Sequence, residues 1–131
     1  TVFLETFTNP HPDVDYKLEF NVERLSSVCP VTGQPDYADL QITYWPGELC
    51  VETKSLKLYV QAFRNERTFM EAAVGKIIKD LADVLRPDQL WVEAWFDARG
   101  GIAASLRFEY PFEDDDEDHD PGEDWKKGVD S

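Results

Sequence analysis

The sequence predicts an α+β domain, built as a four-stranded antiparallel sheet with two helices on one face. Three observations favour this class: two early segments alternate apolar and polar residues, the middle changes to helical spacing, and two strand-like segments follow around a Gly-Gly turn. At 131 residues and 42% hydrophobic composition, the chain has the length of one domain. We expect residues 1–112 to form it, in the order strand, strand, helix, helix, strand, strand.

The first two strands are predicted from period-two alternation. Residues 16–23 place three apolar side chains on one face, and residues 39–45 alternate in the same way until a Pro-Gly pair ends them. Residues 3–15 contain two prolines, each of which removes a backbone donor and keeps its predecessor out of a helix. We therefore expect an irregular lead-in, with no element before Tyr16.

The middle of the chain predicts two helices. Apolar residues at i, i+3, i+4 and i+7 indicate a helix over about 53–65, which Thr53 or Ser55 could cap. A Thr-x-x-Glu capping box at residues 68–71 marks the start of the second helix, which Pro87 ends. The expected buried face of this second helix consists of Phe69, Ala73, Ile77, Leu81 and Val84.

A hairpin completes the predicted sheet. Residues 90–97 and 102–110 are rich in aromatic, aliphatic and β-branched residues, and they join through Arg99-Gly100-Gly101. A four-stranded sheet has two edge strands, which proteins cover or share. We therefore expect an oligomer in which sheets join across subunits.

The negative charge of the chain is concentrated at its end. Residues 113–131 hold 10 acidic and 2 basic side chains and so contribute −8 of the net −14. We expect this tail to be disordered and solvated, with protein binding by its Trp-Lys-Lys end as the alternative. The charge argues against nucleic-acid binding, and the absence of a long apolar run or a leader favours a cytoplasmic protein without a membrane span.

The two cysteines predict neither a disulfide framework nor a metal site. Cys29 and Cys50 could form one bridge at most, and nothing indicates an oxidising compartment. A zinc site favours clustered ligands, whereas these cysteines and the two histidines, His11 and His119, are scattered. We expect reduced thiols and no bound metal.

The stretch CPVTGQPD at 29–36 pairs a cysteine with an acid. Its two prolines restrict the loop, and seven extended residues would separate Cys29 from Asp36 by roughly 23 Å, so the two meet only if Gly33 lets the chain reverse. An ionised Asp36 would raise the pKa of the thiol, so the pair suits a nucleophile and an acid that share one proton. A half-buried loop cysteine and a turn-capping aspartate are the structural alternatives.

A second cluster of polar residues follows in the segments 50–59, 63–65 and 69–71. Lys54 and Lys57 could be the solvated face of the first helix, and Glu71 could belong to the capping box. From the residues alone, the spacing indicates no more than an enzyme that acts on a small molecule.

Five motifs stand in a distinctive order and spacing: CPVTGQPD at 29–36, CVETKSLKLY at 50–59, FRN at 63–65, Phe69-x-Glu71 and RGGI at 99–102. Together they resemble the single-module NADPH-dependent 7-cyano-7-deazaguanine reductases of queuosine biosynthesis, a tRNA modification pathway. The resemblance runs from about Phe7 to Tyr110. It implies a tunnelling fold, in which subunits join their sheets into an oligomeric barrel, stack as rings and form their sites at subunit interfaces.

The resemblance also implies roles for individual residues. Cys29 would add to the substrate nitrile to form a thioimide, Asp36 would donate the proton, and two NADPH would complete reduction to the aminomethyl product. The positions expected to bind substrate are Val51, Glu52, Thr53, Met70 and Glu71, the last of which would accept hydrogen bonds from the guanine-like edge. Lys54, Ser55 and Lys57 match the region associated with NADPH.

One residue departs from the family pattern. Many members carry a histidine where this chain has Met70, which removes a titratable group. The alternatives are a purine-binding protein without turnover and a relative with altered chemistry, such as those that form an amidine on tRNA. Those relatives lose much of the Glu-Thr-Lys-Ser-Leu-Lys region, which this chain retains at 52–57. The related zinc-dependent GTP cyclohydrolases are disfavoured, because no histidine lies near the cysteines in the sequence.

Overall fold

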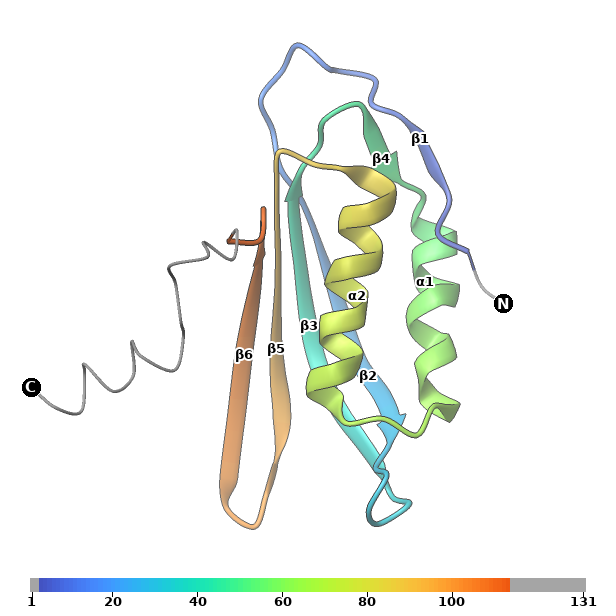
Figure 1. Cartoon of the computed structure of the whole chain (residues 1–131), viewed down its shortest axis with the longest axis vertical. Coiled ribbons are helices and arrows are strands. Elements are labelled where there is room, and N and C mark those ends of the chain that lie inside the picture. Colours follow the sequence, from blue (N-terminus) through green and yellow to red (C-terminus); the bar gives the residue numbers. More distant parts are fainter. Residues whose placement is uncertain (1–2, 114–131) are drawn as a thin grey trace, which may run out of the picture.

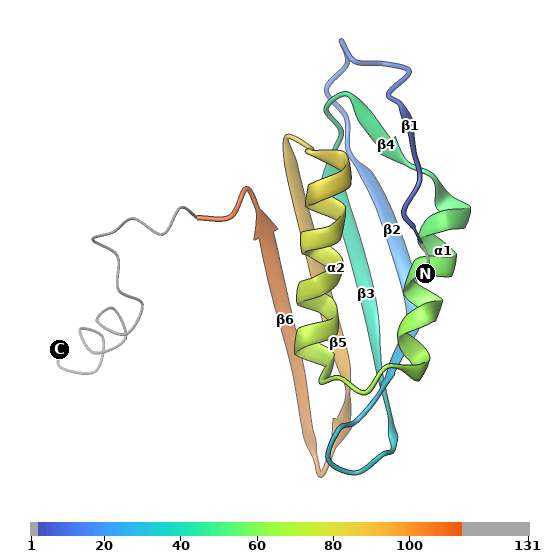
Figure 2. The ribbon, with the colours of Figure 1, turned by 45° about the vertical axis from the view of Figure 1, so that its right-hand side comes forward.

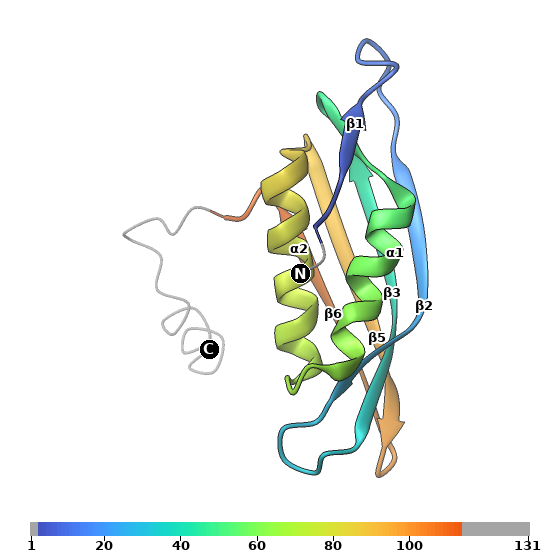
Figure 3. The ribbon, with the colours of Figure 1, turned by 90° about the vertical axis from the view of Figure 1, so that its right-hand side faces the viewer.

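The computed structural model describes residues 3–113. It confirms the four-stranded antiparallel sheet, in the spatial order β2-β3-β5-β6, with both helices on one face (Figures 1–3). The predicted tail lies, apart from Glu113, outside the described residues. The elements are β1 Thr6–Thr8, β2 Leu18–Val28, β3 Pro35–Trp45, β4 Leu49–Val51, α1 Thr53–Gln61, the 3-10 helix η1 Ala62–Asn65, α2 Met70–Leu85, β5 Gln89–Arg99 and β6 Ile102–Tyr110.

The core lies between the sheet and α2. Alternate residues of the two central strands are buried on the side that the helices cover, because successive side chains of a strand point to opposite faces. Each fully buried aliphatic side chain contributes roughly 1.5–3 kcal/mol from the removal of its apolar surface from water. The largest members of this core include Leu40, Ile42, Tyr44, Ile77, Ile78, Leu81, Leu85, Leu90 and Val92.

The structure corrects several predicted boundaries. The lead-in is not free of elements, because β1 pairs antiparallel with β4 in the register Thr6↔Val51. Both strands have three residues, too few to show a period, and their pairing joins segments more than 40 positions apart. The strand predicted over 16–23 begins two residues later and ends five residues later, at 18–28, and the strand predicted over 39–45 begins earlier, at 35–45. The predicted helix 53–65 divides into α1 and η1.

The predicted capping box is also wrong. The N-cap of α2 is Phe69, and no side chain caps this helix. Phe69 is about half exposed instead of lying on the buried face, and Glu71, in the first turn of α2, is exposed. Neither Thr53 nor Ser55 caps α1, because the carboxylate of Glu52 accepts the first free N–H groups of that helix.

Two β-bulges lie toward the same end of the sheet. In β2 the pairing with β3 moves by one extra residue between Val22 and Leu25, and in β5 the pairing with β6 does so between Phe96 and Arg99. Arg24, inside the first bulge, has a positive φ of 58°. Because side chains alternate along a strand, one extra residue changes the face to which every later side chain points.

Candidate active site

Cys29 lies directly after β2, at the start of the turn to β3. The Cys29 N–H donates to the carbonyl of Gln34 at 2.8 Å, and the Gly33 N–H donates back to the Cys29 carbonyl at 2.9 Å. Gly33 has a φ of 73°, a conformation that glycine adopts without steric cost. The chain therefore reverses where the sequence predicts that it must.

The bulge in β2 brings Cys29 and Asp36 to the same face of the sheet. Beyond the bulge, Leu25, Ser27 and Cys29 are the buried positions, and Ser27 stands opposite Asp36 in the register. Cys29, which pairs with Gln34, is thus a diagonal neighbour of Asp36, at a typical separation of roughly 7–8 Å. Asp36 lines the cavity described below, whereas Cys29 is buried next to Asp36 and is not one of the residues that line that cavity.

The local hydrogen bonds favour a reactive thiol. Hydrogen bonds from the Thr32 hydroxyl, and from the N–H groups of Thr32 and Val31, lower the pKa of Cys29 below its ordinary value. Burial and the charge of Asp36 act in the opposite direction and are outweighed. The thiolate is the nucleophilic form of cysteine, so this turn increases the reactive fraction at neutral pH.

The end of β2 is fixed against the segment that leads into α2. Val28 donates its N–H to Glu66 and accepts from Thr68 at 2.8 and 3.0 Å, and the Ser27 hydroxyl donates to the Thr68 carbonyl at 3.0 Å. These bonds place the first turn of α2, with Met70 and Glu71, beside the Cys29 hairpin. Figure 1 shows this turn, the β2–β3 loop and the β5–β6 hairpin at one end of the molecule.

A cavity of about 560 Å³ lies at this end of the sheet. Asp36, Met70 and Glu71 line it, as the resemblance implies for a substrate site, together with Phe69 and Arg99. Asp36 forms an ion pair with Arg99, whose Nη2 also donates to the Pro35 carbonyl at 3.0 Å. Met70 itself is buried in the core, so its side chain forms part of the floor and contributes no titratable group.

The other predicted residues surround the start of α1. Glu52 accepts from the N–H groups of Ser55 at 2.6 Å and Lys54 at 2.9 Å, and these bonds lower its pKa. Val51 is buried and donates its N–H to the Tyr44 hydroxyl. The Ser55 hydroxyl is buried too, and it donates to the Glu52 carbonyl and accepts from the N–H of Glu5, the residue before β1.

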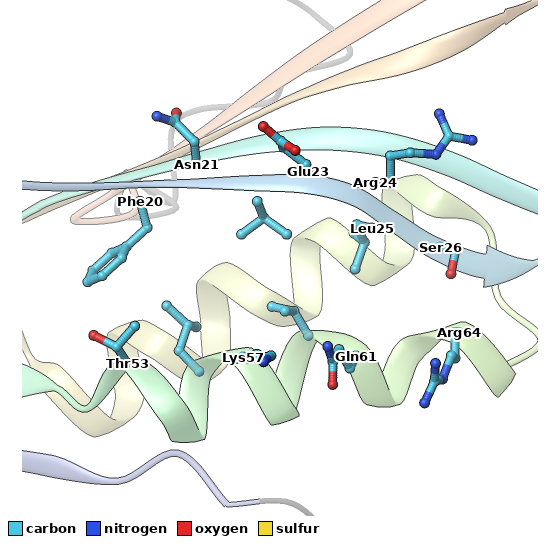
Figure 4. A pocket seen from close by; sticks show the side chains of 13 residues that line it. Phe20, Asn21, Glu23, Arg24, Leu25, Ser26, Thr53, Lys57, Gln61 and Arg64 are labelled. Atoms are coloured by element: carbon cyan, nitrogen blue, oxygen red, sulfur yellow. The ribbon is translucent and has the colours of Figure 1, made fainter.

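A second cavity, of about 400 Å³, separates α1 from β2 (Figure 4). Thr53, Lys57, Gln61 and Arg64 project into it from one side of α1 and η1, and apolar side chains of β2 form the opposite wall. No cofactor role is predicted for Arg64, although it belongs to the FRN motif. Its position seven residues after Lys57 was a usable signal, because i and i+7 share a helix face.

The predicted site residues thus form two groups within one chain. Cys29, Asp36, Met70 and Glu71 lie at the end of the sheet where α2 begins, and residues 51–55 lie at the far end of α1, which is about 13 Å long. The two cysteines are free thiols. Within residues 3–113, no cluster of three or more histidine, cysteine and acidic side chains could hold a metal, and no helix is long and apolar enough to span a membrane.

Comparison with known proteins identifies related sequences over most of the chain. The family described as QueF-like protein matches residues 35–115. A Streptococcus thermophilus protein named NADPH-dependent 7-cyano-7-deazaguanine reductase is 47% identical over 107 residues, which cover 82% of this chain and 66% of that protein. The chain therefore spans about two thirds of the length of this relative.

Proteins with the same name from Nitrosococcus oceani and Rhodopirellula baltica are 44% and 43% identical. The matches cover 82% and 84% of this chain, and 83% and 91% of those proteins. The crystal structure of the archaeosine synthase QueF-Like in the apo form superposes with a TM-score of 0.62 at 17% identity, over 72% of this chain and 91% of that chain. At that identity the likeness concerns the fold alone.

Proposed function

Because this chain belongs to the QueF-like protein family, we propose that it is an NADPH-dependent oxidoreductase that acts on a nitrile. Its substrate is 7-cyano-7-deazaguanine, and its product is 7-aminomethyl-7-deazaguanine, an intermediate of queuosine biosynthesis. The observation that carries the proposal is the placement of an activated thiol, Cys29, on the same sheet face as Asp36, beside a cavity that an acid and an aromatic ring line.

Cys29 is the nucleophile of the proposed reaction. Its sulfur forms a bond to the nitrile carbon, one C≡N π bond breaks, and the proton that began on sulfur passes through the Asp36 carboxylate to the nitrogen. The product of this step is a thioimide, with no change in oxidation state. A nitrile carbon is a poor hydride acceptor, and the protonated C=N unit is a better one, so the acid is as necessary as the thiol.

The substrate is recognised at the first turn of α2. Glu71 is exposed in the same cavity as Asp36, where its two oxygens suit the adjacent N–H groups of a guanine-like edge. The exposed ring of Phe69, in the same cavity, is placed to stack on a flat heterocycle. Met70 adds apolar surface in place of the histidine that many relatives carry.

Positive charge near α1 suits the phosphates of NADPH. Thr53, Lys54 and Lys57 are exposed, and Lys57 shares the second cavity with Arg64. Among residues 3–113, no carboxylate forms an ion pair with Lys54, Lys57 or Arg64. When bound, each NADPH supplies one hydride, so the four-electron reduction to the amine uses two.

A complete site requires a second copy of the chain. Within one subunit, the residues around Cys29 lie apart from the residues at the start of α1 that would bind the cofactor. The edge strands of the described sheet are β2 and β6. Edge strands that pair across subunits would form the oligomeric barrel of a tunnelling fold. This pairing would bring the cofactor-binding residues of one subunit beside Cys29 of the neighbouring subunit. Retention of the 52–57 region favours reduction over amidine formation.

The decisive experiment uses 7-cyano-7-deazaguanine with and without NADPH. With substrate alone, we expect a mass increase on Cys29. With NADPH added, we expect the fall in absorbance at 340 nm to show that two NADPH are oxidised for each amine formed. Cys29→Ala should abolish both signals, whereas the matched variant Cys50→Ala, at the other free thiol, should retain both. Absence of an adduct and of NADPH oxidation in the wild type would contradict the proposal.

A further inference from the structure

Arg99 reaches the cavity only because of the bulge in β5. Phe96 faces the helices, and strict alternation would place Ala98 on that side and Arg99 on the other. The extra residue leaves Asp97 and Ala98 both exposed and returns Arg99, opposite Ile102, to the face of Phe96. The sheet therefore departs from regular pairing at the position that aims this guanidinium at the cavity.

The Arg99 guanidinium holds the Asp36 segment by two contacts. It forms the ion pair with Oδ1 of Asp36, and its Nη2 donates to the neighbouring Pro35 carbonyl at 3.0 Å. The Asp36 side chain is only 17% exposed, whereas that of Arg99 is 54% exposed. The arginine is thus the more exposed partner of the pair, and it restricts the rotation of the carboxylate because it binds both the Asp36 side chain and the adjacent backbone.

The ion pair with Asp36 gives Arg99 an indirect route to Cys29. Asp36 acts on the thiol to raise its pKa, and a neighbouring cation reduces that effect. The other ionisable groups that line the cavity are Tyr37 from β3, Glu71 from α2 and Asp97 from β5. Arg67, from the segment before α2, has its guanidinium close to Gly33, about 3.4 Å from where a Cβ would lie there.

We propose that Arg99 is a positioning residue for Asp36, which it orients and partly neutralises so that a thiolate can form next to this carboxylate. The inference rests on the proposed function for its catalytic consequence. The effect of Arg99 on the reactivity of Cys29, through Asp36, does not depend on that function and can be measured without substrate.

The first test measures the pH dependence of iodoacetamide alkylation of Cys29, in a Cys50→Ala background. Arg99→Gln should move the alkylation profile to higher pH and lower the rate at pH 7, and Arg99→Lys should restore part of the loss. In Asp36→Asn protein, Arg99→Gln should cause no shift. Arg107→Gln, the same change at an ion pair far along β6, is the matched control. An Arg99→Gln profile equal to the wild type, or a shift that persists without Asp36, would overturn the inference.

The second test measures the rate of adduct formation with 7-cyano-7-deazaguanine in the absence of NADPH. Arg99→Gln should slow this step, whereas a residue that only binds cofactor would leave it unchanged and raise the KM for NADPH alone. The latter result would also overturn the inference. If wild-type protein forms no adduct, the proposed function fails, while the alkylation experiment still decides whether Arg99 acts on Cys29 through Asp36.

Discussion

Ser27 connects the β2–β3 hairpin, which carries Cys29, to the segment that leads into α2. Its side chain is fully buried, stands opposite Asp36 in the sheet register, and donates to the Thr68 carbonyl at 3.0 Å. The perturbation that tests this connection is Ser27→Ala, which removes one oxygen and leaves the strand otherwise intact. Ser26→Ala is the matched control, because the neighbouring serine points to the other face and is less buried.

The expected loss follows from the hydrogen bond and its burial. A typical hydrogen bond contributes about 0.5–1.5 kcal/mol net, and a partly buried acceptor left without its donor adds a desolvation cost. We therefore expect a loss of about 1–2 kcal/mol in the free energy of unfolding. In a domain of roughly 100 residues, each kcal/mol lowers Tm by about 4–8 °C. Ser26→Ala should stay within about 0.5 kcal/mol of the wild type.

Urea unfolding followed by circular dichroism measures this difference. All variants must be compared at one protein concentration, because subunit association adds to apparent stability. We also expect Ser27→Ala to raise the KM for 7-cyano-7-deazaguanine, since the first turn of α2 would no longer be fixed beside the hairpin. If Ser27→Ala and Ser26→Ala differ by less than about 0.5 kcal/mol, the reasoning that Ser27 connects these elements is wrong.

Three further predictions concern the turn that follows Cys29 and the N-cap of α1. Thr32→Val removes the hydroxyl that donates to the thiol, so the pKa of Cys29 should rise and iodoacetamide should react more slowly at pH 7; an unchanged alkylation profile would contradict this. Gly33→Ala forces a side chain into a φ of 73° and should cost about 1–2 kcal/mol in urea unfolding, whereas Gly33→Asn, which tolerates this region, should cost less. Glu52 has a lowered pKa in the folded state, so its contribution to stability is present above the unfolded value near 4.5 and is lost as pH falls through the folded value. The stability difference between wild type and Glu52→Gln should therefore shrink in acid, as urea titrations at pH 7 and below pH 4 would show.

Long elements of this fold could be predicted because their periods repeat. Residues 16–23 and 39–45 alternate over several positions, so the strands were identifiable even though their ends were not. β1 and β4 could not be predicted in this way, since three residues carry no period and their pairing depends on the rest of the fold. The capping box failed because a local pattern competed with tertiary contacts: the backbone of Thr68 binds the end of β2 instead of beginning the helix.

The site was predictable only where its residues are close in sequence. Cys29 and Asp36 belong to one hairpin, so the reversal at Gly33 could be inferred from the loop itself. The approach of Arg99 to Asp36 spans more than 60 positions and depends on a bulge that nothing in the residues 96–99 announces. A bulge arises from the fit of whole strands, which is a property of the sheet and not of a short segment.

Contacts of Arg24 link the two bulges on the face of the sheet that the helices leave uncovered. The Arg24 guanidinium lies 4.1 Å above the Tyr37 ring and 3.5 Å from a carboxylate oxygen of Asp97, and the Arg24 N–H donates to Asp39 at 2.9 Å. These contacts hold Arg24 at a positive φ that a non-glycine residue adopts rarely, and they join the bulge of β2 to the bulge of β5 across β3. Exposed ion pairs of this kind add little to stability. Their effect is geometric, because each bulge decides the face to which the residues after it point, Cys29 after one and Arg99 after the other.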